Sequence, residues 1–303
     1  MVTPGGVAGG AGASWRELLA ELEVRLADPG DARRIVERAS GYPAAELWVH
    51  LDELVPARAV GFVDAMAARR ATGEPLQYVV GLWGFRTLEL LVDRRVLIPR
   101  PETEVVVEVA LAELDRVRAG DGPEGAREAG PVQVADLGTG SGAIALSVAA
   151  ERPGTRVWAT DRSPEALAVA RANLAGTGSR VAPLVALAEG HWFHALPADL
   201  RGTLDLVVAN PPYVPDGDLL PAEVEGWEPR IALRSGPQGL DALAEIIGGA
   251  PAWLRRPGTL VLEIDPRQAA AVAAMTRAAG WSAVEVHADL AGRDRVLVAR
   301  WEA

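Results

Sequence analysis

The chain has 303 residues, of which 49% are hydrophobic and 23% charged, a composition that suits a globular protein with a substantial core. It contains no cysteine and no lysine, which excludes disulfides, thiolate catalysis, cysteine-ligated metals, Schiff bases and a P-loop lysine. The net charge of −11 argues against a surface for nucleic acid duplexes, which normally requires a basic stripe, so we expect no stable nucleic-acid partner.

The histidines and the apolar runs exclude two further classes. The four histidines show no metal-ligand spacing, so no metal site is expected. No apolar run approaches the length of a membrane span, and residues 1–13 lack the basic region of a signal peptide. We therefore expect a cytoplasmic protein without membrane attachment, in which the Gly- and Ala-rich residues 1–13 form a disordered tail.

Residues 14–75 are predicted to form a small helical domain. Ser14 and Glu17 fit a capping box at the start of its first helix. Prolines at helix starts and Gly41 at a helix end indicate further boundaries. The predicted helices span residues 15–27, 31–40, 43–51 and 56–72. This domain carries no catalytic constellation, so it either docks a macromolecular partner or covers the next domain.

Residues 76–100 are predicted to be a linker of extended chain and a β-hairpin, because they are rich in aromatic and β-branched residues punctuated by glycines. Pro101 opens a predicted helix that runs to about Arg118, with acidic residues in its first turn. The Gly-, Glu- and Pro-rich residues 119–131 are expected to form a mobile loop.

The catalytic domain is predicted over residues 101–303, where strands and helices alternate. Five apolar runs predict buried parallel strands at residues 132–137, 156–160, 181–187, 204–209 and 259–264. Helices are predicted at residues 143–151, 163–175, 240–254 and 267–279. Residues 283–287 and 295–301 form two last strands that a short polar turn makes antiparallel. This α/β plan is that of a Rossmann-like methyltransferase sheet, parallel with an antiparallel last strand.

A glycine-rich turn follows the first of these strands and opens a helix. It consists of Gly138, Thr139, Gly140, Ser141 and Gly142. Glycines let the backbone approach a ligand closely, and the helix N-terminus offers free N–H groups. Such a turn alone would equally suggest a nicotinamide cofactor. The missing third glycine of the dinucleotide motif and the antiparallel last strand favour S-adenosylmethionine.

Two side chains are expected beside this turn. Asp161 ends the second strand, where a carboxylate accepts hydrogen bonds from ribose hydroxyls. The alternative is that Asp161 caps the helix that begins near Ser163. Trp192 follows the third strand, where an adenine ring can lie against its indole. The alternative for Trp192 is packing in the core.

The segment Asn210-Pro211-Pro212-Tyr213 ends the fourth strand. Two consecutive prolines cannot continue a hydrogen-bonded ladder, so the chain must leave the sheet here. Ligands of open α/β sheets bind outside the carboxyl ends of strands. An amide, a bare carbonyl and an aromatic ring are therefore held where a substrate is expected. The alternative is a proline-rich strand exit in which Tyr213 only packs.

With these motifs together, the chain resembles the protein-(glutamine-N5) methyltransferases that modify peptide chain release factors. The resemblance runs from about residue 14 to the end and is most specific in the segments Val92–Glu104, Asp136–Ala143, Asn210–Tyr213, Glu228–Arg230 and Asp289–Val296. The family usually has an acidic residue just before the aromatic residue near the third strand, and here that position is His191.

The resemblance implies methylation of the glutamine in a Gly-Gly-Gln motif, with S-adenosylmethionine as donor and release factors as partners. It implies that residues 138–142, Asp161, Trp192 and Asn210 contact the cofactor, and that residues 210–213 hold the glutamine. We expect the Asn210 side-chain oxygen and the Pro211 carbonyl to accept the two amide N–H bonds, with Tyr213 as a wall of the pocket. The enzyme then needs only to align this poor nucleophile with the methyl group, and no covalent intermediate is required.

Two other functions compete with this interpretation. A nucleic-acid methyltransferase acting on an exocyclic amine uses a similar Asn-Pro-Pro-Tyr segment on a flipped base. The acidity of the chain counts against it. A non-catalytic adaptor with a vestigial fold is the second, and the intact glycines, Asp161 and the segment of residues 210–213 count against that.

Overall fold

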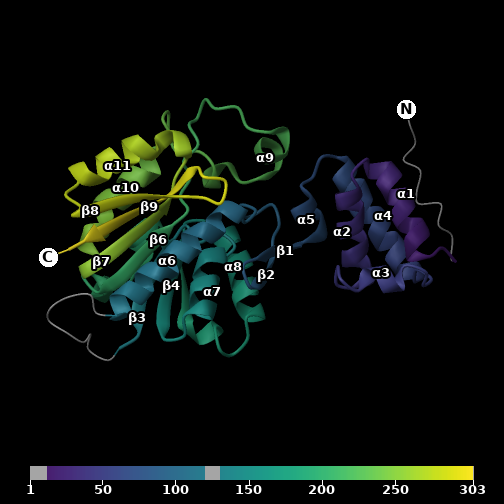
Figure 1. The fold of residues 1–303 in the computed structure, drawn as a ribbon, viewed down its shortest axis with the longest axis horizontal. Helices are drawn as coiled ribbons and strands as arrows, with labels where there is room; N and C mark the ends of the chain where they lie inside the picture. Colours follow the sequence, from purple (N-terminus) through teal and green to yellow (C-terminus); the bar gives the residue numbers. More distant parts are fainter. Residues whose placement is uncertain (1–11, 120–129, 303) are drawn as a thin grey trace. The chain divides into compact units, whose positions relative to one another are not determined.

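The computed structural model describes residues 12–119 and 130–302 (Figure 1). The chain divides into two compact units, residues 1–82 and residues 83–303. The expected disordered tail falls mostly, and the expected mobile loop almost entirely, outside the described residues. Among the described residues, none of the helices combines the length and the apolarity that a membrane span requires.

The first unit is helical. Its helices are α1 (Trp15–Leu26), α2 (Pro29–Ser40), α3 (Leu47–His50), α4 (Ala57–Ala71) and α5 (Leu76–Val80). The predicted capping box is confirmed, because the Ser14 hydroxyl accepts from the Glu17 N–H and the Glu17 carboxylate accepts from the Ser14 N–H. The apolar faces of α1, α2 and α4 form the core of this unit, with Leu22, Ile35 and Val63 fully buried.

Two predicted segments of this unit differ in the structure. Only Leu47–His50 is helical in the expected helix over residues 43–51, because a turn at the Pro43 carbonyl precedes it. Residues 76–80 were expected to be extended, yet they form α5. Pro75 precedes the helix as its N-cap with a ψ of 136°, Gly81 ends the helix with a φ of 76°, and the burial of residues 78–80 overrides their strand propensity.

The second unit begins with a small hairpin and a long helix. Strands β1 (Leu82–Phe85) and β2 (Leu88–Leu91) pair with each other, as the sequence predicted. Helix α6 (Pro101–Ala119) follows and starts at the predicted proline.

The second unit is built on a seven-stranded sheet in the order β5-β4-β3-β6-β7-β9-β8. The strands are β3 (Val132–Leu137), β4 (Thr155–Asp161), β5 (Val185–Glu189), β6 (Leu204–Ala209), β7 (Leu254–Glu263), β8 (Ala283–Ala288) and β9 (Asp294–Trp301). Strands β3 to β7 are parallel and β9 runs antiparallel to β7 and β8, so the predicted fold class is confirmed. Strand β5 starts at Val185 rather than Val181, because Pro183 lies in a short 3₁₀ turn.

Helices cover both faces of this sheet (Figure 1). Helices α6 and α7 (Ala143–Glu151) bury one face, and α8 (Pro164–Gly176) packs beside them. Helices α10 (Asp241–Gly249) and α11 (Ala269–Ala278) bury the other face. Helix α10 ends at Gly249, before the predicted end, because Pro251 follows in a 3₁₀ turn. The short helix α9 (Ala222–Trp227) lies in the long connection after β6.

The register of the sheet brings four strand ends level with one another. Leu137 pairs with Thr160 of β4 and with Ala209 of β6, and Ala209 pairs in turn with Leu262 of β7. The residues that follow this row are Gly138, Asp161, Asn210 and Glu263. Strand β3 lies between β4 and β6. The chain therefore runs from β3 toward one edge of the sheet through β4 and β5, and then returns to the other side of β3 with β6. This is the switch point at which open α/β sheets bind ligands.

Candidate active site

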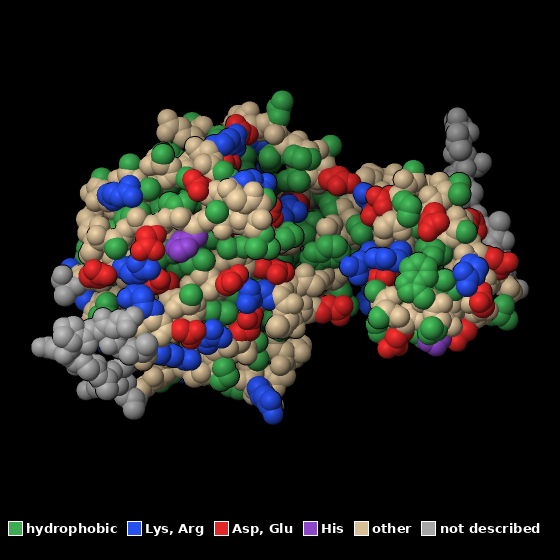
Figure 2. All heavy atoms as spheres, in the orientation of Figure 1, with side chains coloured by type: hydrophobic (Ala, Val, Ile, Leu, Met, Phe, Trp, Pro, Cys, Tyr) green, Lys and Arg blue, Asp and Glu red, His purple; other side chains and the backbone are tan. Residues whose placement is uncertain are grey.

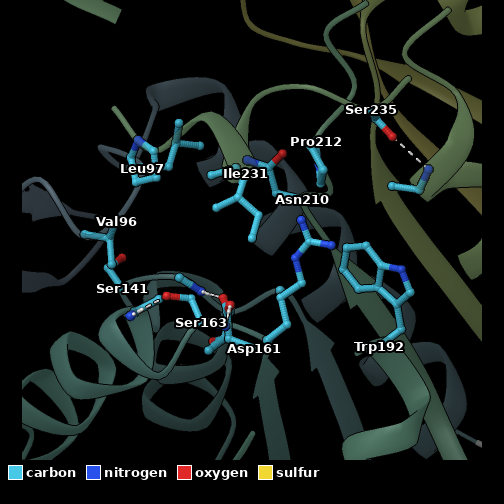
Figure 3. Close-up of a pocket in the computed structure, with 18 of the residues that line it drawn as sticks. Val96, Leu97, Ser141, Asp161, Ser163, Trp192, Asn210, Pro212, Ile231 and Ser235 are labelled. Atoms are coloured by element: carbon cyan, nitrogen blue, oxygen red, sulfur yellow. Dashed lines mark hydrogen bonds between the residues drawn. The ribbon is translucent and has the colours of Figure 1, made fainter. Parts of the chain in front are cut away.

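A pocket of about 290 Å³ opens at this switch point (Figure 3). Most of the predicted cofactor residues line it: Gly138, Thr139, Gly140, Ser141, Asp161, Trp192 and Asn210. Pro212 lines it as well. Gly142 is the exception and packs beneath it, where a Cβ would lie 3.1 Å from Leu146 Cδ1. The role of Gly142 is therefore close helix packing at the start of α7.

The glycine turn is shaped by two close approaches. Gly138 has a φ of 74°, and a Cβ there would lie 3.1 Å from Cζ3 of the Trp192 indole. Gly140 has a φ of 56°, and its N–H donates to Asp161 Oδ2 at 2.9 Å. Both positions thus require the left-handed region, and a side chain at Gly138 would push the indole away.

A buried carboxylate that sequence analysis missed supports the turn from below. Asp136 is fully buried, and its Oδ2 accepts from Thr139 Oγ1 at 2.6 Å and from the Ala145 N–H at 3.1 Å. Burial raises the pKa of Asp136 to about 7, against the opposing effect of these two donors. Asp136 therefore joins the turn to the first turn of α7 without lining the pocket.

Asp161 lines the pocket and also bonds to the start of helix α8, so its position agrees with both alternatives that the sequence suggested. Its Oδ2 accepts from Gly140 N–H, and its Oδ1 accepts from Ser163 N–H at 2.9 Å (Figure 3). Burial raises the pKa of this carboxyl above its ordinary range. The Ser163 hydroxyl caps α8 by accepting from Ala166 N–H. Each Asp161 oxygen can accept a second bond, so the carboxylate remains available to a ligand in the pocket.

Trp192 is held in a strained backbone conformation on the opposite wall. Its φ is 44°, which is uncommon for a residue with a side chain and is typical of functional sites. The indole N–H donates to Glu245 Oε2 at 3.0 Å, and His191 Nε2 lies 3.5 Å from the same oxygen. Glu245 comes from α10 and lines the pocket. The acidic side chain of Glu245 is thus present at the Trp192 end of the pocket, although His191 occupies the position at which the family usually has an acidic residue.

The segment Asn210–Tyr213 separates this pocket from a second one of about 340 Å³. Asn210 and Pro212 line the first pocket, and Asn210, Pro211 and Tyr213 line the second. Asn210 is the shared member of the segment. The Tyr213 hydroxyl donates to Glu263 Oε1 at 3.0 Å. The ring of Tyr213 therefore borders the second pocket, while its hydroxyl is turned into the protein.

A buried set of hydrogen bonds, which the sequence did not predict, connects two segments that line the pockets. Glu228 is buried, and its carboxylate accepts from the Arg100 guanidinium and from the Ile98 N–H at 3.2 Å. It thereby ties the chain before α6 to the segment that starts at Pro229. In the sequence, residues 228–230 stood out only as a motif of the family, and this motif does not indicate that Glu228 binds Arg100.

The pocket fits S-adenosylmethionine. The glycine turn offers an open backbone, the Asp161 carboxylate is an acceptor for ribose hydroxyls, and Trp192 offers a flat apolar face for an adenine ring. Glu245 lines the same pocket beside the Trp192 indole and supplies a further acceptor. Together with the sheet order, these features define a class I S-adenosylmethionine-dependent methyltransferase.

Comparison with known proteins narrows this class. Residues 13–81 match the PrmC N-terminal domain, and residues 127–222 match the methyltransferase small domain. A release factor glutamine methyltransferase of Cereibacter sphaeroides is 42% identical over 275 residues, which cover 89% of this chain and 90% of the relative. Another, from Moorella thermoacetica, is 43% identical over 295 residues, which cover 94% and 97%. The chain belongs to the release factor glutamine methyltransferase family, as its motifs indicated.

A solved structure supports the fold alone. The hMettl16 catalytic domain in complex with MAT2A 3′UTR hairpin 6 is 14% identical, with a TM-score of 0.51, and the match covers 83% of this chain and 84% of that one.

Proposed function

We propose that this protein transfers the methyl group of S-adenosylmethionine to the side-chain nitrogen of the glutamine in the Gly-Gly-Gln motif of peptide chain release factors. Family membership over nearly the whole chain supports this activity. The observation that carries it is the position of Asn210, which borders both pockets. One pocket has the features of a cofactor site, so the second is available to the methyl acceptor.

The cofactor-binding residues are proposed to be residues 138–141, Asp161, Trp192 and Asn210. When bound, S-adenosylmethionine supplies an electrophilic methyl group on a sulfonium. Asp161 would accept from the ribose hydroxyls, and the Trp192 indole would offer a flat face to the adenine ring. Gly142 acts indirectly, through the packing of α7.

The residues proposed to hold the glutamine are Asn210, Pro211, Pro212 and Tyr213. An amide nitrogen is a poor nucleophile because its lone pair is delocalised into the carbonyl. The Asn210 side-chain oxygen and the Pro211 carbonyl accept its two N–H bonds, so the nitrogen faces the first pocket. Such alignment lowers a barrier by roughly 7–11 kcal/mol in favourable cases. The nitrogen forms one N–C bond as the S–C bond breaks, and it releases one proton to solvent.

The helical unit is proposed to dock the release factor in the cytoplasm. The match to the PrmC N-terminal domain supports this role, as do exposed apolar side chains on its helices. Trp48 and Phe62 are 55% and 46% exposed.

Methylation of a nucleic acid is not favoured. Acidic and arginine side chains are interspersed on the face that Figure 2 shows, without an extended basic stripe on that face. The net charge of −11 agrees with this distribution.

The experiment is incubation of the protein with methyl-labelled S-adenosylmethionine and a release factor. We expect label in the wild-type release factor and none in a variant whose Gly-Gly-Gln glutamine is changed. Equal labelling of the two factors, or labelling of RNA alone, would contradict the proposed function.

A further inference from the structure

Three residues from distant parts of the chain, one of them Asn210, are joined by hydrogen bonds beside the first pocket. Thr103 comes from the first turn of α6, Asn210 follows β6, and Glu263 ends β7. Asn210 Nδ2 donates to Thr103 Oγ1 at 3.2 Å, and Thr103 Oγ1 donates to Glu263 Oε2 at 2.6 Å. Thr103 and Glu263 are only 4% and 1% exposed, so water does not replace these partners.

The direction of these bonds determines which end of the Asn210 amide contacts Thr103 and which end is left for another partner. A hydroxyl has one hydrogen, and Thr103 donates it to the Glu263 carboxylate, which only accepts. Thr103 Oγ1 can therefore only accept from Asn210. The amide must turn its NH₂ group toward Thr103, and its Oδ1 then faces away from this contact. The side-chain oxygen is the atom that the proposed mechanism needs for the glutamine N–H.

The other oxygen of Glu263 holds the second polar residue of the same segment. Glu263 Oε1 accepts from the Tyr213 hydroxyl at 3.0 Å. Burial raises the pKa of Tyr213 above its ordinary range, and the nearby Glu263 charge raises it further, so this hydroxyl stays a donor. A single carboxylate thus fixes both ends of the Asn210–Tyr213 segment.

We infer that Glu263 is a positioning residue for methyl transfer, which orients the Asn210 amide through Thr103 and anchors Tyr213 directly. This inference rests on the proposed function of Asn210. It requires Glu263 to act as an acceptor toward two hydroxyl donors at once. Glutamine has a single side-chain oxygen and a donating NH₂ group, so it has the same shape without this capacity.

The surroundings of Glu263 favour a pH-dependent effect. Burial raises the pKa of Glu263, Glu102 of α6 acts in the same direction, and Thr103, Tyr213 and Arg295 of β9 oppose it. Protonation would let Glu263 donate to Thr103 and so reverse the hydrogen bond to Asn210. Transfer by the wild type should therefore fall as the pH decreases, at a higher pH than for an ordinary glutamate, and Glu263→Gln should lack this titration.

The test compares Glu263→Gln with Glu113→Gln. Glu113 is another buried carboxylate of this unit, bound to Arg300 and Thr259 away from both pockets, so it controls for lost stability. We expect Glu263→Gln to lower single-turnover methylation of a release factor about 100-fold, the scale of a small misplacement at a reacting centre. Its Kd for S-adenosylhomocysteine should stay within about twofold of the wild type, because the ribose and adenine contacts remain.

A second pair of variants keeps the inference testable if Glu263→Gln does not fold. Thr103→Val removes the relay hydroxyl and should slow transfer like Glu263→Gln, whereas Thr103→Ser keeps it and should restore most of the rate. Thr276→Val removes a buried hydroxyl bonded within α11 and is the matched control.

Several outcomes would overturn the inference. One is a transfer rate of Glu263→Gln equal to that of Glu113→Gln, and another is a loss of S-adenosylhomocysteine affinity in Glu263→Gln that parallels its loss of rate. A third is a decrease of the Glu263→Gln rate at low pH that matches that of the wild type. The last is an equal rate for Thr103→Ser and Thr103→Val. A wild type that methylates no release factor would instead overturn the proposed function, and this inference with it.

Discussion

The two sides of the candidate site each depend on a buried carboxylate, and these carboxylates act over very different distances in the sequence. Asp136 accepts from Thr139 and Ala145, three and nine residues away. Glu263 accepts from Thr103 and Tyr213, 160 and 50 residues away. Both are buried, and each accepts a threonine hydroxyl at 2.6 Å. One supports a backbone turn, and the other supports side chains.

The difference shows what each kind of binding site needs. The cofactor side presents a glycine turn, which nearby residues of the same motif support from within and the adjacent strand end at Asp161 completes. The acceptor side must orient one amide, whose two ends differ only in hydrogen-bonding capacity. Its orientation comes from polar partners on α6 and β7, which only the assembled sheet brings together.

The largest expected effect is at Asn210, on the acceptor side. Asn210→Ala should leave the protein folded and lower kcat by orders of magnitude, because each 1.36 kcal/mol of lost transition-state stabilisation costs about tenfold. Asn210→Asp keeps an acceptor oxygen and should retain more activity than Asn210→Ala. Single-turnover methylation at saturating cofactor measures both, with circular dichroism as the control for folding. Near-normal rates in both variants would remove Asn210 from the mechanism.

Asp161 tests the cofactor side. Asp161→Ala should weaken S-adenosylhomocysteine binding by roughly 1.5–3 kcal/mol, the range of one hydrogen bond to a charged group. The rate at saturating cofactor should change much less than in Asn210→Ala. Calorimetric titration gives the affinity. An unchanged Kd in a folded variant would show that Asp161 only links Gly140 to the start of α8.

Asp136 tests the same side through stability. The pKa of Asp136 is about 7 in the folded protein, against the ordinary value of 3.8 in the unfolded chain. Between these values the unfolded chain releases a proton that the folded protein keeps, so this group lowers the free energy of unfolding as the pH rises. As the pH rises from about 5 to about 8, the free energy of unfolding of Asp136→Asn should therefore increase by at least about 1 kcal/mol relative to that of the wild type.

Urea unfolding of the cofactor-free protein at both pH values measures this difference. A parallel pH dependence of the two proteins would mean that Asp136 is ionised in the fold throughout this range.

The smallest effect is expected in the helical unit. Trp48→Ala should raise KM for a whole release factor about three- to tenfold, the scale of an aromatic interface contact, without changing kcat. Leu290→Ala is the matched control, because Leu290 is 97% exposed in the turn before β9 of the other unit. Steady-state kinetics with the whole factor and with a short glutamine peptide separates docking from chemistry. Equal KM values for both variants would contradict docking through Trp48.

The same contrast explains how much could be predicted from the sequence. Strand periodicity, prolines and glycines predicted the sheet and its antiparallel strand, because these signals are local. They also identified Gly138, Asp161 and Asn210, which the structure places at one edge. Thr103 and Glu263 could not be found this way, since no local pattern links residues 160 positions apart. Helix α5 was missed because burial outweighs propensity.

The most direct test is a double-mutant cycle between Glu263 and Asn210 in methyl transfer to a release factor glutamine. The four proteins are the wild type, Glu263→Gln, Asn210→Ala and the double variant, compared by single-turnover rate. If Glu263 acts by orienting Asn210, Glu263→Gln should lower the wild-type rate strongly and lower the Asn210→Ala rate little. Equal penalties in both backgrounds would contradict the account, because Glu263 would then act independently of the Asn210 amide.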